Sequence, residues 1–82
     1  MNWQTGFPTK EGEYLCVTEY NGRQMYRLLN FSKDLYSVDK YDFYELASKH
    51  IAGFYEYDTE WGYYKVDNVM AWCKIYPYRK EG

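Results

Sequence analysis

The sequence predicts a small, mainly β (α+β) domain: a five-stranded, mostly antiparallel sheet with one short helix or structured loop between its second and third strands. Three observations predict it. Apolar side chains recur with the two-residue period of an extended chain, most clearly from Val69 to Pro77. Asn21-Gly22 stands between two such runs and signals a tight hairpin, because both turn residues must take positive φ. The length of 82 residues fits one domain, with no second core.

Residues 1–12 form an irregular lead-in, punctuated by Pro8 and Gly12. Trp3 is one of the few large apolar residues in this segment. We expect Trp3 to fold back and cover one edge of the core, as terminal segments do when they are tied down.

Residues 13–31 are predicted to form a β-hairpin around Asn21-Gly22. A two-residue loop fixes the residues that face each other, namely Tyr20 with Arg23, Val17 with Tyr26 and Leu15 with Leu28. One face then carries Leu15, Val17, Tyr26 and Leu28. We expect that face to be the core and the opposite face to be partly covered.

Residues 32–50 lose the strict alternation. A short helix over about 43–50 is one interpretation, because Asp42 and Glu45 have the spacing of a capping box. A loop with one turn of helix is the other.

Residues 51–77 are predicted to form a three-stranded meander, divided by turns at 58–60 and 67–68. Asp67-Asn68 tolerates left-handed backbone conformations, so a tight hairpin would place Val66 opposite Val69. The last strand, Val69 to Pro77, has apolar groups on both faces, which indicates an inner strand with Trp72 in the core. Pro77 ends it, because proline has no N–H for the sheet.

Charge and composition narrow the class of protein. The net charge of −2 and the interspersed lysines and arginines argue against a protein that grips nucleic acid through phosphates. The sequence has no signal-peptide pattern and no apolar run near the roughly 18 residues of a membrane span, so we expect a cytoplasmic protein with no membrane partner. Cys16 and Cys73 lie in apolar runs and are expected to be buried free thiols, although a disulfide between them stays open.

Both ends of the chain resemble a small phage and prophage family of unknown function. The resemblance rests on Trp3, Pro8, the run from Gly12 to Val17, and the run from Val69 to Pro77. Family members open with Trp, then Pro and Gly, then a Tyr/Val-Leu-Val strand, and they close with a His/Ala-Trp-Met-Pro-Leu-Pro motif. The chain departs at Cys73 and Lys74, where the family has Met and Pro. The resemblance implies a phage or mobile-element setting and supplies no catalytic residues.

Residue types that carry chemistry are sparse. His50 is the one histidine, and no Cys-x-x-Cys, His-Glu-x-x-His or phosphate-loop spacing is present. A pair of Cys16 or Cys73 with His50 would need an accessible thiol, and both thiols are expected to be buried. We therefore predict no enzymatic activity, no cofactor, no metal and no small-molecule substrate.

Aromatic residues are the remaining signal: 23% of the chain, including 12 tyrosines, and they crowd the C-terminal strands. They are interpreted either as an aromatic core with exposed ring edges or as an exposed docking patch for a host or defence protein, or for a second copy of the chain. The predicted partner-binding residues are Tyr55, Tyr57, Trp61, Tyr63 and Lys65. A protein-binding phage accessory factor, for example an inhibitor of the anti-CRISPR type, is the first functional hypothesis. Single-stranded nucleic-acid binding through the strand aromatics, with Arg23, Arg27 and Lys65 as a local basic stripe, is the alternative.

Overall fold

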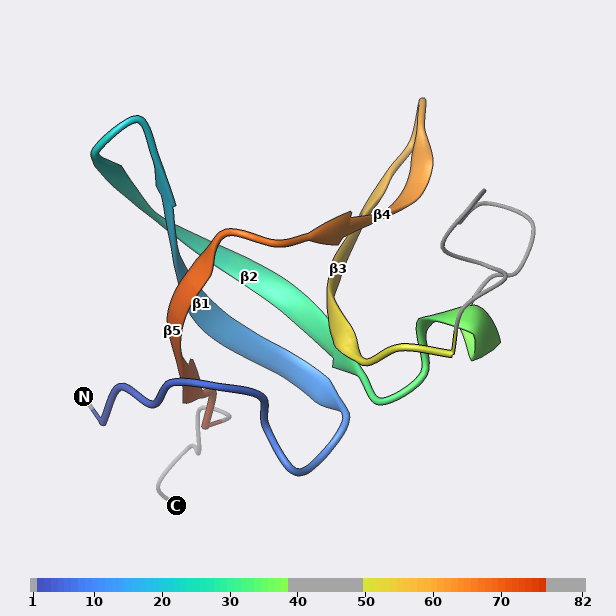
Figure 1. Ribbon diagram of the computed structural model, residues 1–82, viewed down its shortest axis with the longest axis horizontal. Helices are drawn as coiled ribbons and strands as arrows, with labels where there is room; N and C mark the ends of the chain where they lie inside the picture. Colours follow the sequence, from blue (N-terminus) through green and yellow to red (C-terminus); the bar gives the residue numbers. More distant parts are fainter. Residues whose placement is uncertain (1, 39–49, 77–82) are drawn as a thin grey trace, which may run out of the picture.

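The computed structural model is a single antiparallel sheet of five strands, as the sequence predicts (Figure 1). It describes residues 2–38 and 50–76. The strands are β1 (Gly12–Tyr20), β2 (Arg23–Ser32), β3 (Gly53–Asp58), β4 (Gly62–Val66) and β5 (Val69–Lys74). A 3₁₀ turn, η1 (Leu35–Ser37), follows β2. The helix or loop predicted near residues 43–50 falls almost entirely outside the described residues.

The first hairpin has the predicted turn and register. Asn21 and Gly22 both take positive φ, 52° and 77°, as a two-residue turn between right-twisted strands requires. The predicted pairs Tyr20–Arg23, Val17–Tyr26 and Leu15–Leu28 are all present in the β1–β2 ladder. Local turn chemistry therefore determines this part of the fold.

Gly22→Val tests the turn. A β carbon at Gly22 would meet nothing within 4 Å, so the cost of substitution is conformational rather than steric packing. Because a β-branched residue resists positive φ, we expect the free energy of unfolding to fall by about 1 kcal/mol or more in a chemical denaturation experiment. Gly22→Asn is the matched control, since asparagine tolerates positive φ, and it should lose much less. Equal losses for the two variants would count against the turn geometry.

The β4–β5 connection differs from the predicted hairpin, which was wrong. Strand order in the sheet is β4-β3-β2-β1-β5, so β4 and β5 lie at opposite edges although only Asp67 and Asn68 separate them. Five flat strands would hold the edge strands about 19 Å apart, whereas the three Cα steps from Val66 to Val69 span at most about 11 Å. The sheet must therefore curl strongly, and the linker crosses its concave side (Figure 1).

Contacts with β1 explain why the tight hairpin does not form. Asn68 is bound to Glu19 of β1 through both its backbone and its side chain. Its backbone oxygen accepts the Glu19 N–H at 3.2 Å, and its Nδ2 donates to the Glu19 backbone oxygen at 3.0 Å. The strand after Asn68 then pairs with β1. This partner is about fifty residues away along the chain, beyond the reach of a local turn signal.

Strand β5 is an edge strand, not the predicted inner strand. Its outer side is paired at one point, where the backbone N–H and oxygen of Trp72 bond to those of Gln4, both at 2.8 Å. The N-terminal segment thus lies along the outer edge of β5, where the sequence pattern predicted a further strand. The buried residues of β5 are Trp72 on the inner face and Cys73 on the outer face.

The core lies on the face of β1 and β2 opposite to the predicted one. Its buried residues, on the concave inner face, are Tyr14, Cys16, Leu29, Phe31, Phe54, Val66 and Trp72. The predicted core face of Leu15, Val17, Tyr26 and Leu28 is the outer face, where Tyr26 and Leu28 are exposed. The curl of the sheet and the N-terminal segment decide this, because Phe7 packs on Phe31 and Phe54, with ring centroids 5.4 and 6.2 Å away. Trp3 instead lies on the outer face, with its ring 6.0 Å from that of Tyr26.

A second, smaller cluster supports the far end of the sheet. Leu35 of η1 is fully buried there against partly buried neighbours, which are Tyr36, Val38, Ile51, Tyr55 and Tyr63. Asp34 caps η1 by accepting the Tyr36 N–H, and the Leu35 N–H bonds to the Ile51 oxygen at 2.9 Å. This cluster fixes the β3–β4 hairpin, which carries the predicted site.

Candidate functional site

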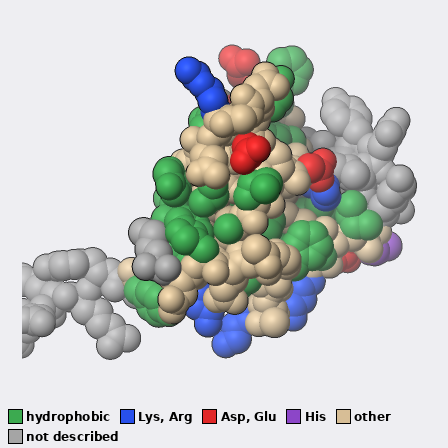
Figure 2. All heavy atoms as spheres, turned by 60° about the vertical axis from the view of Figure 1, so that its left-hand side comes forward, with side chains coloured by type: hydrophobic (Ala, Val, Ile, Leu, Met, Phe, Trp, Pro, Cys, Tyr) green, Lys and Arg blue, Asp and Glu red, His purple; other side chains and the backbone are tan. Residues whose placement is uncertain are grey.

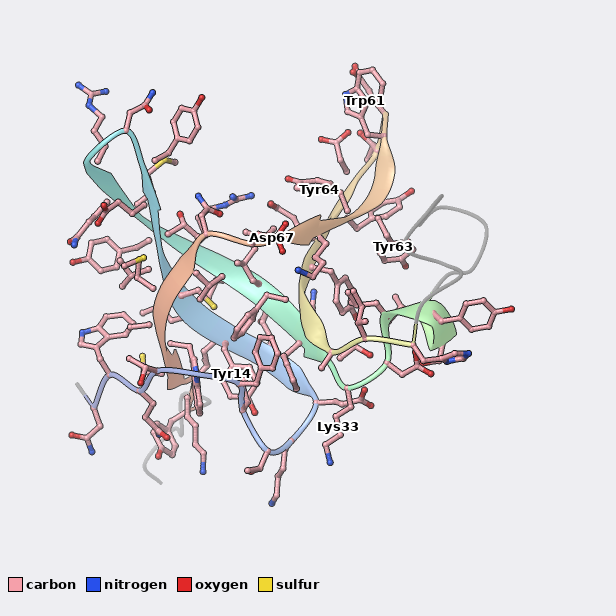
Figure 3. All side chains as sticks on the ribbon, viewed as in Figure 1. Tyr14, Lys33, Trp61, Tyr63, Tyr64 and Asp67 are labelled. Atoms are coloured by element: carbon pink, nitrogen blue, oxygen red, sulfur yellow. The ribbon has the colours of Figure 1, made fainter. Side chains whose placement is uncertain are left out.

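The tip of the β3–β4 hairpin is built by Asp58. Its Oδ1 accepts the backbone N–H groups of Glu60 and Trp61, at 2.7 and 3.1 Å, and Gly62 closes the loop with φ 77°. An aspartate before a three-residue loop with a left-handed glycine is a favoured hairpin connection. The loop therefore holds Trp61 at the apex (Figure 3), where 78% of it is exposed.

A row of tyrosines runs down one face of the same hairpin. Tyr57 and Tyr63 are direct cross-strand partners with ring centroids 4.9 Å apart, and Tyr55 lies 5.8 Å from Tyr63. Tyr57 is 56% exposed, whereas Tyr55 and Tyr63 are half-buried against Leu35. Burial, with smaller effects from Tyr63 and Glu11, raises the pKa of Tyr55. Tyr55 and Tyr63 thus anchor the hairpin, and Tyr57 is the ring they present to solvent.

Lys65 is held against the protein surface by contacts within the chain. Its amine pairs with the Asp67 carboxylate, and its stem passes so close to Gly53 that a β carbon there would lie 3.0 Å from Lys65 Cε. The structure thus brings Lys65 to the same face as Tyr55, as predicted from the sequence, but in a packing role. Of the five predicted site residues, Tyr57 and Trp61 are the ones that project into solvent.

The opposite face of the hairpin holds a polar group that the sequence did not reveal. Tyr64 Oη donates to Glu56 Oε2 at 2.6 Å, and Arg27 of β2 both pairs with Glu56 and donates to Tyr64 Oη at 3.3 Å. Figure 3 shows Tyr63 and Tyr64 pointing to opposite sides of β4. Only the alternation of Glu56 and Tyr64 along their strands was available as a signal, and it does not identify Arg27. This group ties the hairpin to β2 and neutralises a cation of the predicted basic stripe.

His50 has a partner other than a cysteine. Its Nδ1 lies 2.9 Å from Asp34 Oδ2, and its ring is 4.7 Å from that of Tyr36. Within residues 2–38 and 50–76, no three potential ligands from His, Cys, Asp and Glu come together as a metal site would require. The arrangement supports a role for His50 in fixing the turn after β2.

Both cysteines are free and buried. The β1–β5 register places Cys16 opposite Trp72 and Leu15 opposite Cys73, so alternation points the two thiols to opposite faces of the sheet. Cysteine side chains that point apart cannot form a disulfide without backbone movement. Burial, followed by the effect of Cys73, raises the pKa of Cys16 to about 11.

Thiol reactivity provides a test of this placement. We expect Ellman's reagent to label few thiols in the folded protein at neutral pH and both after denaturation, because a buried neutral thiol is a poor nucleophile. The contribution of Cys16 to stability should be constant below the ordinary thiol pKa of about 8.5 and should fall as the pH rises toward 11, since the fold disfavours its thiolate. Rapid labelling of the folded protein would contradict the burial of these strands, and unreactive thiols after denaturation would reveal a disulfide.

No protein-family model matches the chain, and no curated protein or solved structure does so either. In the described part of the chain, no helix is long and apolar enough to cross a membrane.

Proposed function

We propose that the chain is a non-enzymatic protein-binding module, a phage or mobile-element accessory protein that works in the host cytoplasm and binds a host or defence protein. The presentation of Tyr57 and Trp61 carries this proposal. Both are large aromatic residues, both are more than half exposed, and both stand on a hairpin whose base is held by a buried cluster. The phage setting, including inhibition of the anti-CRISPR type, is supported by the resemblance at the two ends of the sequence.

Physical reasons favour a protein as the partner. Tyrosine and tryptophan are enriched among the few residues that dominate binding energy, and they bury a large area while fixing few torsions. The Asp58 loop and the Tyr55–Tyr63 contact hold the rings in place before binding, which lowers the entropy lost on association. Asp58 and Glu60 beside Trp61 supply the polar rim that surrounds such anchors.

Single-stranded nucleic acid is the second candidate, because exposed rings also stack on bases. A binder of this kind tracks the phosphate backbone with free cations. Two of the three residues of the predicted stripe are paired within the chain, Arg27 with Glu56 and Lys65 with Asp67. The described surface thus offers Trp61 and Tyr57 with little basic charge beside them.

Replacing Tyr57 and Trp61 together by alanine tests the proposal. The mass of the protein in solution is measured first, and its affinity for a partner recovered from host lysate second. We expect the double variant to lose at least about 2 kcal/mol of binding free energy and to keep its fold, because both side chains are exposed.

The matched control replaces Tyr20 and Met25, which are equally exposed on the other long hairpin. This control should bind as the wild type does. A monomer that recovers no protein, yet binds labelled single-stranded DNA or RNA with a steep salt dependence, would overturn the proposal in favour of the alternative.

A further inference from the structure

The outer face of β5, β1 and β2 carries a compact apolar grid, separate from the hairpin tip. The strand registers align Cys73, Leu15 and Leu28 in one row across the three strands, and Ala71, Val17 and Tyr26 in the next. Polar rows bound the grid, because Glu13 pairs with Asn30 at one end and Glu19 with Gln24 at the other. An apolar centre with a polar rim is the make-up of a protein-docking surface.

The protein covers this grid only in part. The rings of Trp3 and Tyr26 meet over the second row, and Val17 beneath is buried. Tyr26 is nevertheless 66% exposed and Leu28 56% exposed. Figure 2, in which the left-hand side of Figure 1 comes forward, shows apolar side chains open to solvent on this side of the molecule.

Beside this ring pair the first row lies at the floor of a groove. The groove has a volume of about 660 Å³, and its walls come from the N-terminal segment at Asn2 and Gln4 and from the chain after β5 at Ile75 and Tyr76. Its apolar floor residues are Leu15, Leu28 and Cys73. A sheet face of this kind is normally covered by a packed element.

The size of the grid indicates what kind of partner could cover it. Three strands span about 10 Å from centre to centre, and the two rows lie about 7 Å apart along the strands. That footprint is far below the roughly 800 Å² per partner of a stable protein–protein interface, so it does not suffice for a second copy of the chain. It matches one α-helix, whose diameter with side chains is about 10–12 Å.

The charges around the grid indicate which charges a bound helix would carry. Lys74 contributes a positive charge to the lining of the groove. The rows that bound the grid place Glu13 and Glu19 on the outer face, so acidic side chains outnumber this cation around the grid. A twofold pairing of two copies would set these glutamates against each other, whereas a helix with basic flanks would complement them. We propose that the outer face of β5, β1 and β2 docks a short amphipathic helix of a protein partner, with apolar side chains on the grid and in the groove and Lys or Arg on its flanks.

Two synthetic peptides test this proposal on the purified protein. Both are helices of about five turns with leucine at i, i+3, i+4 and i+7 spacing, and they differ in carrying lysine or glutamate at the flanking positions. Fluorescence anisotropy of the labelled peptides is measured at low and high salt. We expect the lysine peptide to bind about tenfold more tightly than the glutamate peptide, and the difference to shrink at high salt.

Variants of the protein locate the binding. Leu28→Glu should abolish binding of the lysine peptide, and Tyr20→Glu, an equally exposed control on the same hairpin, should not. Glu13→Lys with Glu19→Lys should reverse the preference between the peptides with the apolar grid intact. The Tyr57→Ala, Trp61→Ala variant should bind the lysine peptide as the wild type does, which separates this proposal from the hairpin-tip proposal.

Several results would overturn the proposal. These are equal affinities for the two peptides, binding that survives Leu28→Glu, and no binding of either peptide. A dimer in solution that Leu28→Glu dissociates would also overturn it, because the occupant would then be a second copy.

Discussion

Trp72→Ala is expected to leave the chain without a cooperative fold. The Trp72 side chain is buried, its ring packs edge-on against Tyr14 at a centroid distance of 5.0 Å, and its Nε1 donates to the Gly6 oxygen at 2.9 Å. Removing a buried Trp side chain typically costs about 3–5 kcal/mol, which is a large part of the 5–15 kcal/mol available to an ordinary domain. The near-UV circular dichroism spectrum should collapse, and the urea unfolding transition should broaden or vanish.

The position of Trp72 explains why the effect should be global. Its backbone joins β5 to the N-terminal segment through Gln4, and its side chain ties the same segment through Gly6. Loss of the ring therefore loosens the segment that brings Phe7 over the inner face. Trp61→Ala is the matched control, since the exposed Trp61 contributes little to packing. If Trp72→Ala unfolded in urea as cooperatively as Trp61→Ala and at the same urea concentration, Trp72 would not be a core residue.

Features that depend on neighbours in sequence were predictable. Asn21-Gly22 fixed the turn and the register of β1 with β2, and the strand periods placed β3 and β4 close to their observed bounds. Strand β5 begins at Val69 as predicted but ends at Lys74, before the predicted end at Pro77. The strand partner of β5 was not predictable, because a local turn signal at Asp67-Asn68 competes with pairing to β1, which depends on the curl of the whole sheet. Which face of β1 and β2 is buried was also not predictable, because both faces are apolar and the segments that cover them are distant in sequence.

The candidate site also has a part that the sequence indicates and a part that depends on contacts with distant residues. An excess of aromatic residues in the C-terminal strands pointed to Tyr57 and Trp61, which are exposed, but equally to Tyr55 and Tyr63, which pack on Leu35. Periodicity alone cannot separate these pairs, because Tyr55, Tyr57 and Tyr63 share one face. Packing on Leu35, which lies outside the hairpin, determines which of these tyrosines are half-buried. The pairing of Arg27 with Glu56 has the same long-range origin.

Two adjacent leucines provide the sharpest test of which face is the core. Leu29 is fully buried on the inner face, and Leu28, its neighbour in β2, is exposed on the outer face. Leu29→Ala should lower the free energy of unfolding by about 2–5 kcal/mol, because it removes transfer energy and leaves a cavity. Leu28→Ala should change it by no more than about 0.5 kcal/mol, the usual effect of an exposed substitution. Urea unfolding of the two variants measures both values.

The comparison is matched, because the substitution, the strand and the backbone conformation are the same and only the face differs. A strand has a side-chain period of two, so an exchange of faces would exchange the two results. A larger loss for Leu28→Ala would therefore place the core on the Leu15 and Val17 face. Large losses for both would mean that the outer face is covered within the chain itself, and no site for a partner helix would remain there. The expected result, a large loss for Leu29→Ala and a small one for Leu28→Ala, leaves Leu28 as apolar surface that folding does not need, beside the buried Val17 and Cys73.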